Sequence, residues 1–282
     1  MRWPFPGLPA EAARQKRRKP LITAAGNPKI KNLMNLMKKG KARKEQGLFV
    51  AEGLKMFLEA EPDRLTEVYV SHTFFASLEK GGNVRNRLSA CSTEILSDSL
   101  FQKVSDTQTP QGILCVLRQY HYAKEELLKR ENPLLLLIED IQDPGNLGTM
   151  LRTAEGAGAD GVIMSRGTVD IYNPKTIRST MGSIYRVPFF YTGEMPETVS
   201  WLKTKGIAVY AAHLQGKKAY YEEAFRGGTA FLIGNEARGL KEETAQVASQ
   251  LMKIPMEGRV ESLNAGVAAS ILLYEAARQR SS

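Results

Sequence analysis

From residue 133 onward, short apolar runs alternate with segments of helical period. The runs that predict strands are 134–138, 161–164, 206–211, 229–233 and 251–254. Runs that are apolar at nearly every position are typical of strands buried on both faces, as in a parallel sheet covered by helices. The pattern predicts a parallel α/β domain over residues 133–282 that ends in a long helix within "ESLNAGVAASILLYEAARQR".

The pattern over residues 21–118 is that of a smaller unit. Residues 28–40 read as an amphipathic helix with Gly40 as its C-terminal cap. The segment "GLFVAEG" predicts a strand that enters a helix reaching about Glu59, and "TEVYV", "ACSTEIL" and "GILCVL" predict further strands. These elements predict a small α/β domain over 21–118, and the polar segment 119–132 is expected to be a helical linker between the two domains.

The composition is that of a globular protein. The chain has 282 residues, of which 43% are hydrophobic and 24% charged. We see no signal peptide and no apolar run near the roughly 18 residues that a membrane span needs. Two cysteines and three scattered histidines predict neither a disulfide framework nor a metal site, and they are compatible with a reducing cytoplasm.

The positive charge is concentrated at the N-terminal end. Residues 1–44 hold thirteen Lys or Arg and one acid, Glu11, although the net charge of the whole chain is only +9. Such a patch favours a polyanion, and nucleic acid above all. Residues 1–20 are expected to form a disordered basic tail, for which a purely solubilising role stays open. The stronger candidates for nucleic-acid binding lie on the ordered segment that follows: Lys29, Lys31, Lys38, Lys39, Lys41, Arg43 and Lys44.

The segment "DPGNLG", residues 143–148, follows the first strand of the larger domain and precedes a helix. This order is also that of a dinucleotide-binding unit, but the glycine spacing does not match G-x-G-x-x-G. The alternative is a plain turn in which Pro144 and Gly145 reverse the chain. A plain turn does not explain why the polar residues Asn146 and Arg152 occur near the start of the helix, where both can border one ligand site.

Two more strand ends carry polar residues. "FLIGNEARGL" (231–240) and "IPMEGRVESLNAG" (254–266) each begin in a predicted strand. Because the carboxyl ends of parallel strands meet at one edge of a sheet, the three loops are expected to converge there. Ser262 could instead be a helix N-cap, and Asn264 falls within the first turn of the final helix. The candidate catalytic residues are Asn146, Arg152, Glu236, Ser262 and Asn264.

Together these segments resemble the three motifs of the SpoU (TrmH-type) RNA 2′-O-ribose methyltransferases. "DPGNLGTMLRTA" is similar to the first motif, "IGNEARGL" to the second and "IPMEGRVESLNAGVAASILLYE" to the third. The N-terminal segment "NPKIKNLMNLMKKGKAR", followed by "FVAEG", resembles the small substrate-binding domain of ribosomal-RNA-directed members. One departure is "SLNAGVA", where relatives commonly have "SLNVSVA".

The resemblance implies a fold, a cofactor and a reaction. The fold is a parallel-sheet domain with a C-terminal trefoil knot, which acts as a homodimer and transfers a methyl group from S-adenosylmethionine to a ribose 2′-hydroxyl of RNA. Within that family 23S ribosomal RNA is the expected target, and a tRNA, a base atom, or an inactive RNA-binding or ribosome-assembly role are the alternatives. The resemblance also implies the residues that hold the cofactor: Leu232, Gly234, Ile254, Met256 and Leu263.

Overall fold

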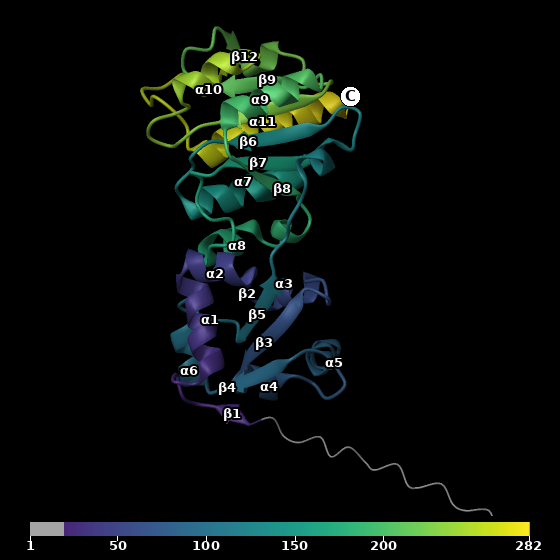
Figure 1. Ribbon diagram of the computed structural model, residues 1–282, viewed down its shortest axis with the longest axis vertical. Helices are drawn as coiled ribbons and strands as arrows, with labels where there is room; N and C mark the ends of the chain where they lie inside the picture. Colours follow the sequence, from purple (N-terminus) through teal and green to yellow (C-terminus); the bar gives the residue numbers. More distant parts are fainter. Residues whose placement is uncertain (1–19, 282) are drawn as a thin grey trace, which may run out of the picture.

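The computed structural model describes residues 20–281, so nearly all of the predicted basic tail lies outside the described residues. The chain folds around two separate β-sheets, one of five and one of seven strands (Figure 1). The two parts are stacked along the long axis of the molecule, and helix α8 (Pro174–Thr180) lies where they meet (Figure 1).

The smaller sheet has the strand order β1-β4-β3-β5-β2. Its strands are β1 (Leu21–Ile22), β4 (Thr93–Leu96), β3 (Leu65–Ser71), β5 (Ile113–Arg118) and β2 (Leu48–Glu52). The β2–β5 and β3–β5 pairs are antiparallel, and β1, β4 and β3 run parallel. The helices of this part are α1 (Pro28–Lys38), α2 (Gly40–Gln46), α3 (Leu54–Glu59), α4 (His72–Ser77), α5 (Asn83–Ala90) and α6 (Asp98–Val104).

The basic helix of the smaller part differs from the sequence prediction at its end. Ile30, Leu33 and Leu36 face the core as the helical period requires. The prediction that Gly40 caps this helix is wrong. Lys39 has an extended backbone and ends α1, and Gly40 begins α2, which ends at Gly47 in the left-handed conformation.

The larger sheet is parallel throughout and has the strand order β10-β12-β9-β11-β6-β7-β8. Its strands are β6 (Leu134–Ile138), β7 (Gly161–Ser165), β8 (Phe189–Thr192), β9 (Ala208–Ala212), β10 (Lys218–Ala219), β11 (Thr229–Ile233) and β12 (Gln250–Lys253). Strands β1, β8 and β10 were not predicted from the sequence, since β1 and β10 have only two residues and β8 is a four-residue strand at the edge of the sheet.

Helices cover both faces of this sheet. Along β6, Leu134, Leu136 and Ile138 pack into one core and Leu135 and Leu137 into another. The first core includes residues of α7 (Pro144–Gly156) and α11 (Ala265–Arg280), and the second includes residues of α9 (Met195–Thr204) and α10 (Glu242–Val247). This two-sided burial is what the uninterrupted apolar runs predicted.

The segment between the sheets is less helical than predicted. It holds a single five-residue 3₁₀ helix, η1 (Lys124–Leu128). Before that helix, Tyr120 is buried, and its backbone N–H donates to the Tyr172 hydroxyl at 2.7 Å. Because Tyr120 is held against the larger domain in this way, its stretch of chain lies outside any helix.

Candidate active site

The three loops that carry the predicted site residues follow β6, β11 and β12, which end at the same edge of the sheet. The first loop enters α7 at Asp143, whose carboxylate caps the helix by accepting from the backbone N–H of Asn146 at 2.8 Å. Pro144 occupies the first helical turn, where its missing N–H costs nothing. This geometry presents the Asn146 side chain at the start of the helix.

Glu236, from the second loop, holds the first loop in place. One carboxylate oxygen accepts from the Asn146 side-chain amide at 3.0 Å and from the Asp143 backbone N–H at 3.2 Å. The other accepts from the Gln142 backbone N–H at 3.2 Å. These residues lie 90 to 94 positions before Glu236 in the sequence, so the contacts fix how the two loops meet.

These hydrogen bonds also set the protonation of Glu236. Partial burial favours the neutral form, but the hydrogen bonds from the Asn146 side chain and from the backbone N–H groups of the loop outweigh it and lower the pKa of the Glu236 carboxyl below its ordinary value. Glu236 is therefore an anion at neutral pH and acts as an acceptor only.

The third loop joins through Asn264. Its side-chain amide donates to the Asn146 side-chain oxygen at 2.9 Å. Its own oxygen accepts from the backbone N–H groups of Gly266 and Val267 and so caps α11. Asn264, rather than Ser262, is therefore the N-cap. Ser262 is exposed and makes no side-chain hydrogen bond with any residue between 20 and 281.

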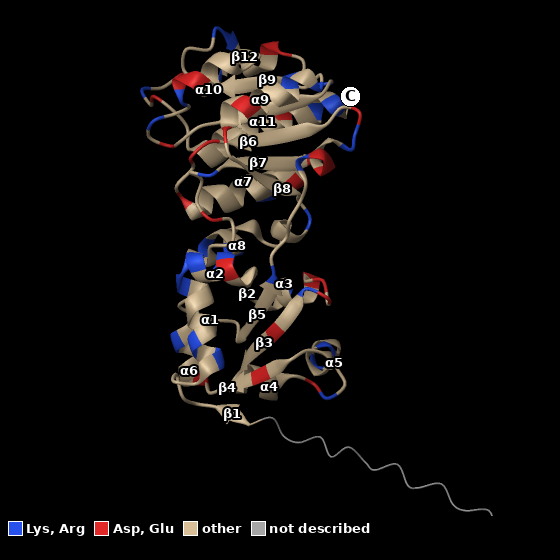
Figure 2. Ribbon diagram, viewed as in Figure 1, with Lys and Arg blue, Asp and Glu red and all other residues tan. Residues whose placement is uncertain are grey.

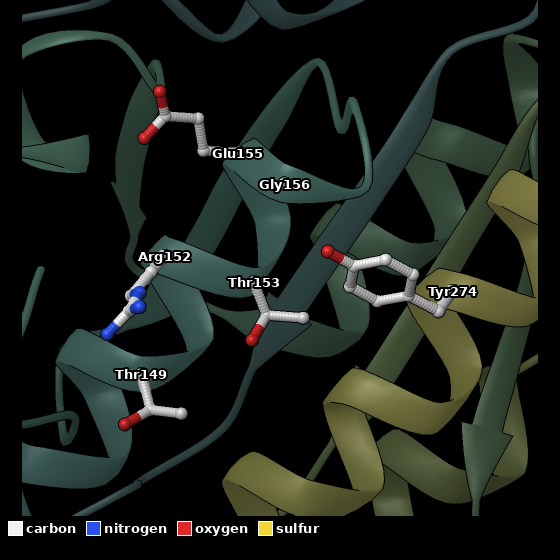
Figure 3. Close-up of a pocket in the computed structure, with 6 residues that line it drawn as sticks. All are labelled: Thr149, Arg152, Thr153, Glu155, Gly156 and Tyr274. Atoms are coloured by element: carbon white, nitrogen blue, oxygen red, sulfur yellow. The ribbon is translucent and has the colours of Figure 1, made fainter.

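Arg152 lies apart from this hydrogen-bonded set. It is exposed on α7 and forms no ion pair or hydrogen bond within the described part of the chain. It borders a shallow cavity of about 540 Å³ between α7 and α11 (Figure 3). The cavity is lined by Thr149, Arg152, Thr153, Glu155, Gly156 and Tyr274. The guanidinium is thus available to a ligand.

The residues predicted to hold a cofactor fall into two groups. Gly234, Ile254, Met256 and Leu263 are partly exposed on the second and third loops. Leu232 differs, because it belongs to β11 and its side chain is completely buried in the core on one face of the sheet. Gly234 packs so closely that a Cβ there would lie 2.4 Å from the backbone of Gly239 and of Leu240. Apolar side chains and backbone groups from these loops are a suitable lining for an adenosine, whose base is flat and largely apolar.

Most of the predicted nucleic-acid-binding residues lie on the surface of α1 and α2. Figure 2 shows basic residues along both helices. The exposed members of the predicted set are Lys29, Lys31, Lys38, Lys39, Lys41 and Lys44. Lys29 is paired with Glu94 at 2.5 Å. Arg43 does not belong to this surface: it is 4% exposed and bound to Asp170 of the larger domain.

The sequence interpretation missed some residues of the site. Gln142 and Asp143 bind Glu236 through their backbone, and Lys175 of α8 pairs with Asp143 at 3.2 Å. The Asp-Pro pair was an N-cap signature that could have identified Asp143. Nothing in the sequence marked Lys175. Among residues 20–281 there is no cluster of side chains able to hold a metal ion and no helix long and apolar enough to cross a membrane.

Fold and site together define a two-domain α/β protein in which a basic domain adjoins a polar site at the strand ends of a parallel sheet. The chain belongs to the SpoU rRNA Methylase family, whose model matches residues 133–274. The model of the MRM3-like substrate binding domain matches residues 27–115.

Three of the relatives match this chain over 90% or more of its length. The chain is 35% identical over 257 residues to the 23S rRNA (guanosine(2553)-2′-O)-methyltransferase RlmP of Bacillus subtilis, covering 90% of this chain and 97% of that protein. The AdoMet-bound rRNA methyltransferase from Sinorhizobium meliloti superposes with a TM-score of 0.80 at 29% identity, over 92% of this chain and 97% of that one. The SpoU methyltransferase AviRb from Streptomyces viridochromogenes superposes with a TM-score of 0.78 at 27% identity, over 90% and 98% of the two chains.

Proposed function

We propose that this protein transfers the methyl group of S-adenosylmethionine to a ribose 2′-hydroxyl of 23S ribosomal RNA in the cytoplasm. The observation that carries the proposal is the hydrogen-bonded chain Glu236–Asn146–Asn264, which joins the three family motifs at one edge of the sheet. The reactions named for RlmP and for the Streptomyces viridochromogenes 23S rRNA (uridine(2479)-2′-O)-methyltransferase support this choice of RNA.

The second and third loops would hold the cofactor. Gly234, Ile254, Met256 and Leu263 would contact it through backbone groups and apolar side chains, with Leu232 packing underneath. When bound, the sulfonium supplies an activated methyl group with a good leaving group. The protein's own tasks would then be to align the 2′-oxygen with the methyl group and to leave a path by which the hydroxyl proton is released to water as the O–CH3 bond forms and the S–CH3 bond breaks.

Arg152 would bind beside the 2′-oxygen and an RNA phosphate. Arginine is a poor base, so its role is to stabilise negative charge that develops on the oxygen. Glu236 would orient the first loop rather than Arg152, because its hydrogen bonds go to Asn146 and to the backbone of that loop. Asn146, Asn264 and Ser262 would position the ribose.

We also propose that the protein is a homodimer and that its C-terminal part forms the family's trefoil knot. Support for a dimer comes from Val267 and Tyr274 of α11, which are 48% and 54% exposed. Tyr274 lines the same cavity as Arg152 (Figure 3). Support for the knot comes from the match to the SpoU rRNA Methylase family model, which extends through the C-terminal part to residue 274.

The test is methyl transfer by the purified protein. Tritiated S-adenosylmethionine is offered with 23S rRNA, 16S rRNA or bulk tRNA, and the modified nucleotides are mapped as 2′-O-methyl or base-methyl products. We expect one 2′-O-methylated nucleotide in 23S rRNA. If only tRNA is labelled, or if the methyl group is found on a base atom, the proposed substrate is wrong. Binding of rRNA without any transfer would mean an inactive binding protein.

A further inference from the structure

Arg43 is a buried cation at the boundary between the two domains. Its Nε and Nη2 donate to one carboxylate oxygen of Asp170 at 2.9 and 2.7 Å. Its Nη1 donates to the carbonyls of Leu36 and Met37, at the end of α1, at 2.8 and 3.3 Å. All three guanidinium nitrogens therefore have protein partners, and with 4% of the residue exposed none is offered to RNA.

Asp170 belongs to the short segment between β7 and α8, and Tyr172 of this segment makes a second contact with the smaller domain. The other carboxylate oxygen of Asp170 accepts from the Tyr172 backbone N–H at 2.9 Å. The Tyr172 hydroxyl donates to the Tyr120 carbonyl at 2.8 Å and accepts from the N–H of the same residue at 2.7 Å. The Tyr172 ring also lies 4.9 Å from the ring of Phe49 in β2. The segment between β7 and α8 thus contacts α2 through Asp170, and the chain just after β5 through Tyr172.

The same segment is tied to the candidate active site. The Val169 N–H donates to the Ile141 carbonyl at 2.8 Å. The Gln142 side chain donates to the Gly167 carbonyl at 2.7 Å, and the Gln142 backbone N–H donates to Glu236 at 3.2 Å. Hydrogen bonds, together with the backbone of residues 167–170, therefore connect Arg43 to the loop that leads to Asn146.

The other ion pairs between the domains, within residues 20–281, have no buried partner. Arg178 pairs with Asp106 at 2.9 Å and Arg186 with Glu59 at 2.6 Å, and all four side chains are between 31% and 49% exposed. Exposed pairs contribute little to stability, whereas a buried pair costs much when one partner is removed. In the Arg43–Asp170 pair the Asp170 side chain is 37% exposed, but the Arg43 side chain is only 5% exposed and all of its guanidinium nitrogens have partners.

We infer that Arg43 and Asp170 are positioning residues that fix the RNA-binding surface of α1 and α2 at a set distance from the active site. RNA held by the lysines of that surface then presents one ribose to Arg152 and no other. The inference rests on the proposed methyl transfer to RNA. It assigns Arg43 to the geometry of catalysis, whereas the neighbouring lysines supply affinity.

The experiment compares Arg43→Met with Lys44→Met, which removes an exposed cation from the same helix. For each full-length variant, RNA affinity, the single-turnover rate of methylation and the map of methylated nucleotides are measured. We expect Arg43→Met to bind RNA as the wild type does, to methylate about 100-fold more slowly, and to spread methylation to neighbouring nucleotides, because misplacement of about 1 Å is enough for such a loss. Lys44→Met should weaken RNA binding without spreading methylation to neighbouring nucleotides. If Arg43→Met behaves like Lys44→Met, or like the wild type, the inference is wrong.

A double variant separates positioning from stability. Asp170→Asn alone leaves Arg43 as a buried cation without its carboxylate and should lower the melting temperature; Arg43→Met with Asp170→Asn removes both charges, keeps an acceptor for the Tyr172 N–H and should restore it. We expect the rate to stay low in the double variant. Recovery of the rate together with stability would make the pair purely structural and overturn the inference.

Failure of the proposed function gives a different pattern. In that case the wild type methylates no RNA at all. The role of the Arg43–Asp170 pair can then still be tested through the distance between two dyes, one placed on each domain. Arg43→Met should broaden the distribution of this distance. An unchanged distribution would overturn the inference independently of activity.

Discussion

The Asn264 side chain has two roles. Its amide donates to the Asn146 side-chain oxygen at 2.9 Å, and its oxygen caps α11 by accepting from the backbone N–H groups of Gly266 and Val267. The start of the last helix and the start of α7 are thereby fixed to each other. Since Asn146 is also bound by Glu236, the position of each of the three loops depends on the other two.

Substitution at Asn264 can separate its hydrogen bond to Asn146 from its role as the N-cap of α11. Asp is as good an N-cap as Asn, so Asn264→Asp should keep the melting temperature but lose the donor to Asn146 and place a second anion near Glu236. Asn264→Ala should lose both functions and destabilise the protein by about 1 kcal/mol. Methyl-transfer rates and thermal unfolding of the two variants check this. Full activity in Asn264→Asp would show that the bond to Asn146 has no catalytic use.

Glu236→Gln tests the anionic acceptor at the centre of the loops. A charged hydrogen bond contributes about 1.5–3 kcal/mol, so losing one that positions Asn146 should slow methyl transfer by about 10- to 100-fold. The measurement is the single-turnover rate at saturating cofactor and RNA. Glu222→Gln, a change at an exposed carboxylate of the 3₁₀ helix η3 (Tyr220–Glu222), serves as the control and should leave the rate unchanged.

The pH dependence of stability follows from the same carboxyl. Its pKa is lower in the folded protein than in the unfolded chain, so the stabilising effect is complete above the unfolded-state value of about 4.3 and is lost as pH falls through the folded value. Wild type should therefore lose more unfolding free energy than Glu236→Gln when the pH is lowered below that point. Denaturant titrations at pH 7 and in the acid range measure the difference, and parallel losses in the two proteins would contradict the prediction.

The sequence predicted the parallel sheet and the meeting of the three loops because both follow from local patterns: apolar runs for buried strands, polar residues directly after them. It did not predict the role of Arg43, which is indistinguishable in sequence from the lysines beside it. That role depends on Asp170, 127 residues away, and on the way two domains pack. The N-cap at Asn264 was missed for a local reason, since Ser262 is an equally good capping residue and only the path of the backbone decides between them.

Gly234→Ala should abolish cofactor binding while the fold survives at reduced stability. The added Cβ would lie 2.4 Å from the backbone of Gly239 and Leu240, and no flexible side chain is there to move aside. The loop must shift, and Glu236 with it. Gly258→Ala, in the third loop, meets no atom within 4 Å and is the matched control. Calorimetry with S-adenosylmethionine should show weak or no binding for the first variant and wild-type binding for the second.

The exposed lysines of α1 and α2 should govern the salt dependence of RNA binding. Each phosphate contact that is lost lowers the slope of log affinity against log salt by about 0.7 to 0.9. Replacing Lys38, Lys39 and Lys41 by Gln should therefore weaken binding and flatten that slope. Replacing Lys80 and Lys205, exposed lysines outside both helices, should leave the slope as it is. An unchanged slope in the first variant would exclude α1 and α2 as the docking surface.

Arg152 offers the sharpest test of the chemistry, because its side chain is exposed beside the cavity between α7 and α11 and has no structural partner within residues 20–281 (Figure 3). Arg152→Ala should therefore leave the melting temperature and the cofactor affinity intact while the rate falls by about 100- to 1,000-fold, the usual effect of removing a group that stabilises developing negative charge. Arg152→Lys keeps the positive charge but not the planar fork, so an electrostatic role predicts partial activity. Arg226→Ala, which removes an exposed arginine outside this cavity, is the control and should be fully active. Near-wild-type turnover in Arg152→Ala would remove this residue from the mechanism and leave Asn146, Ser262 and Asn264 to position the ribose without it.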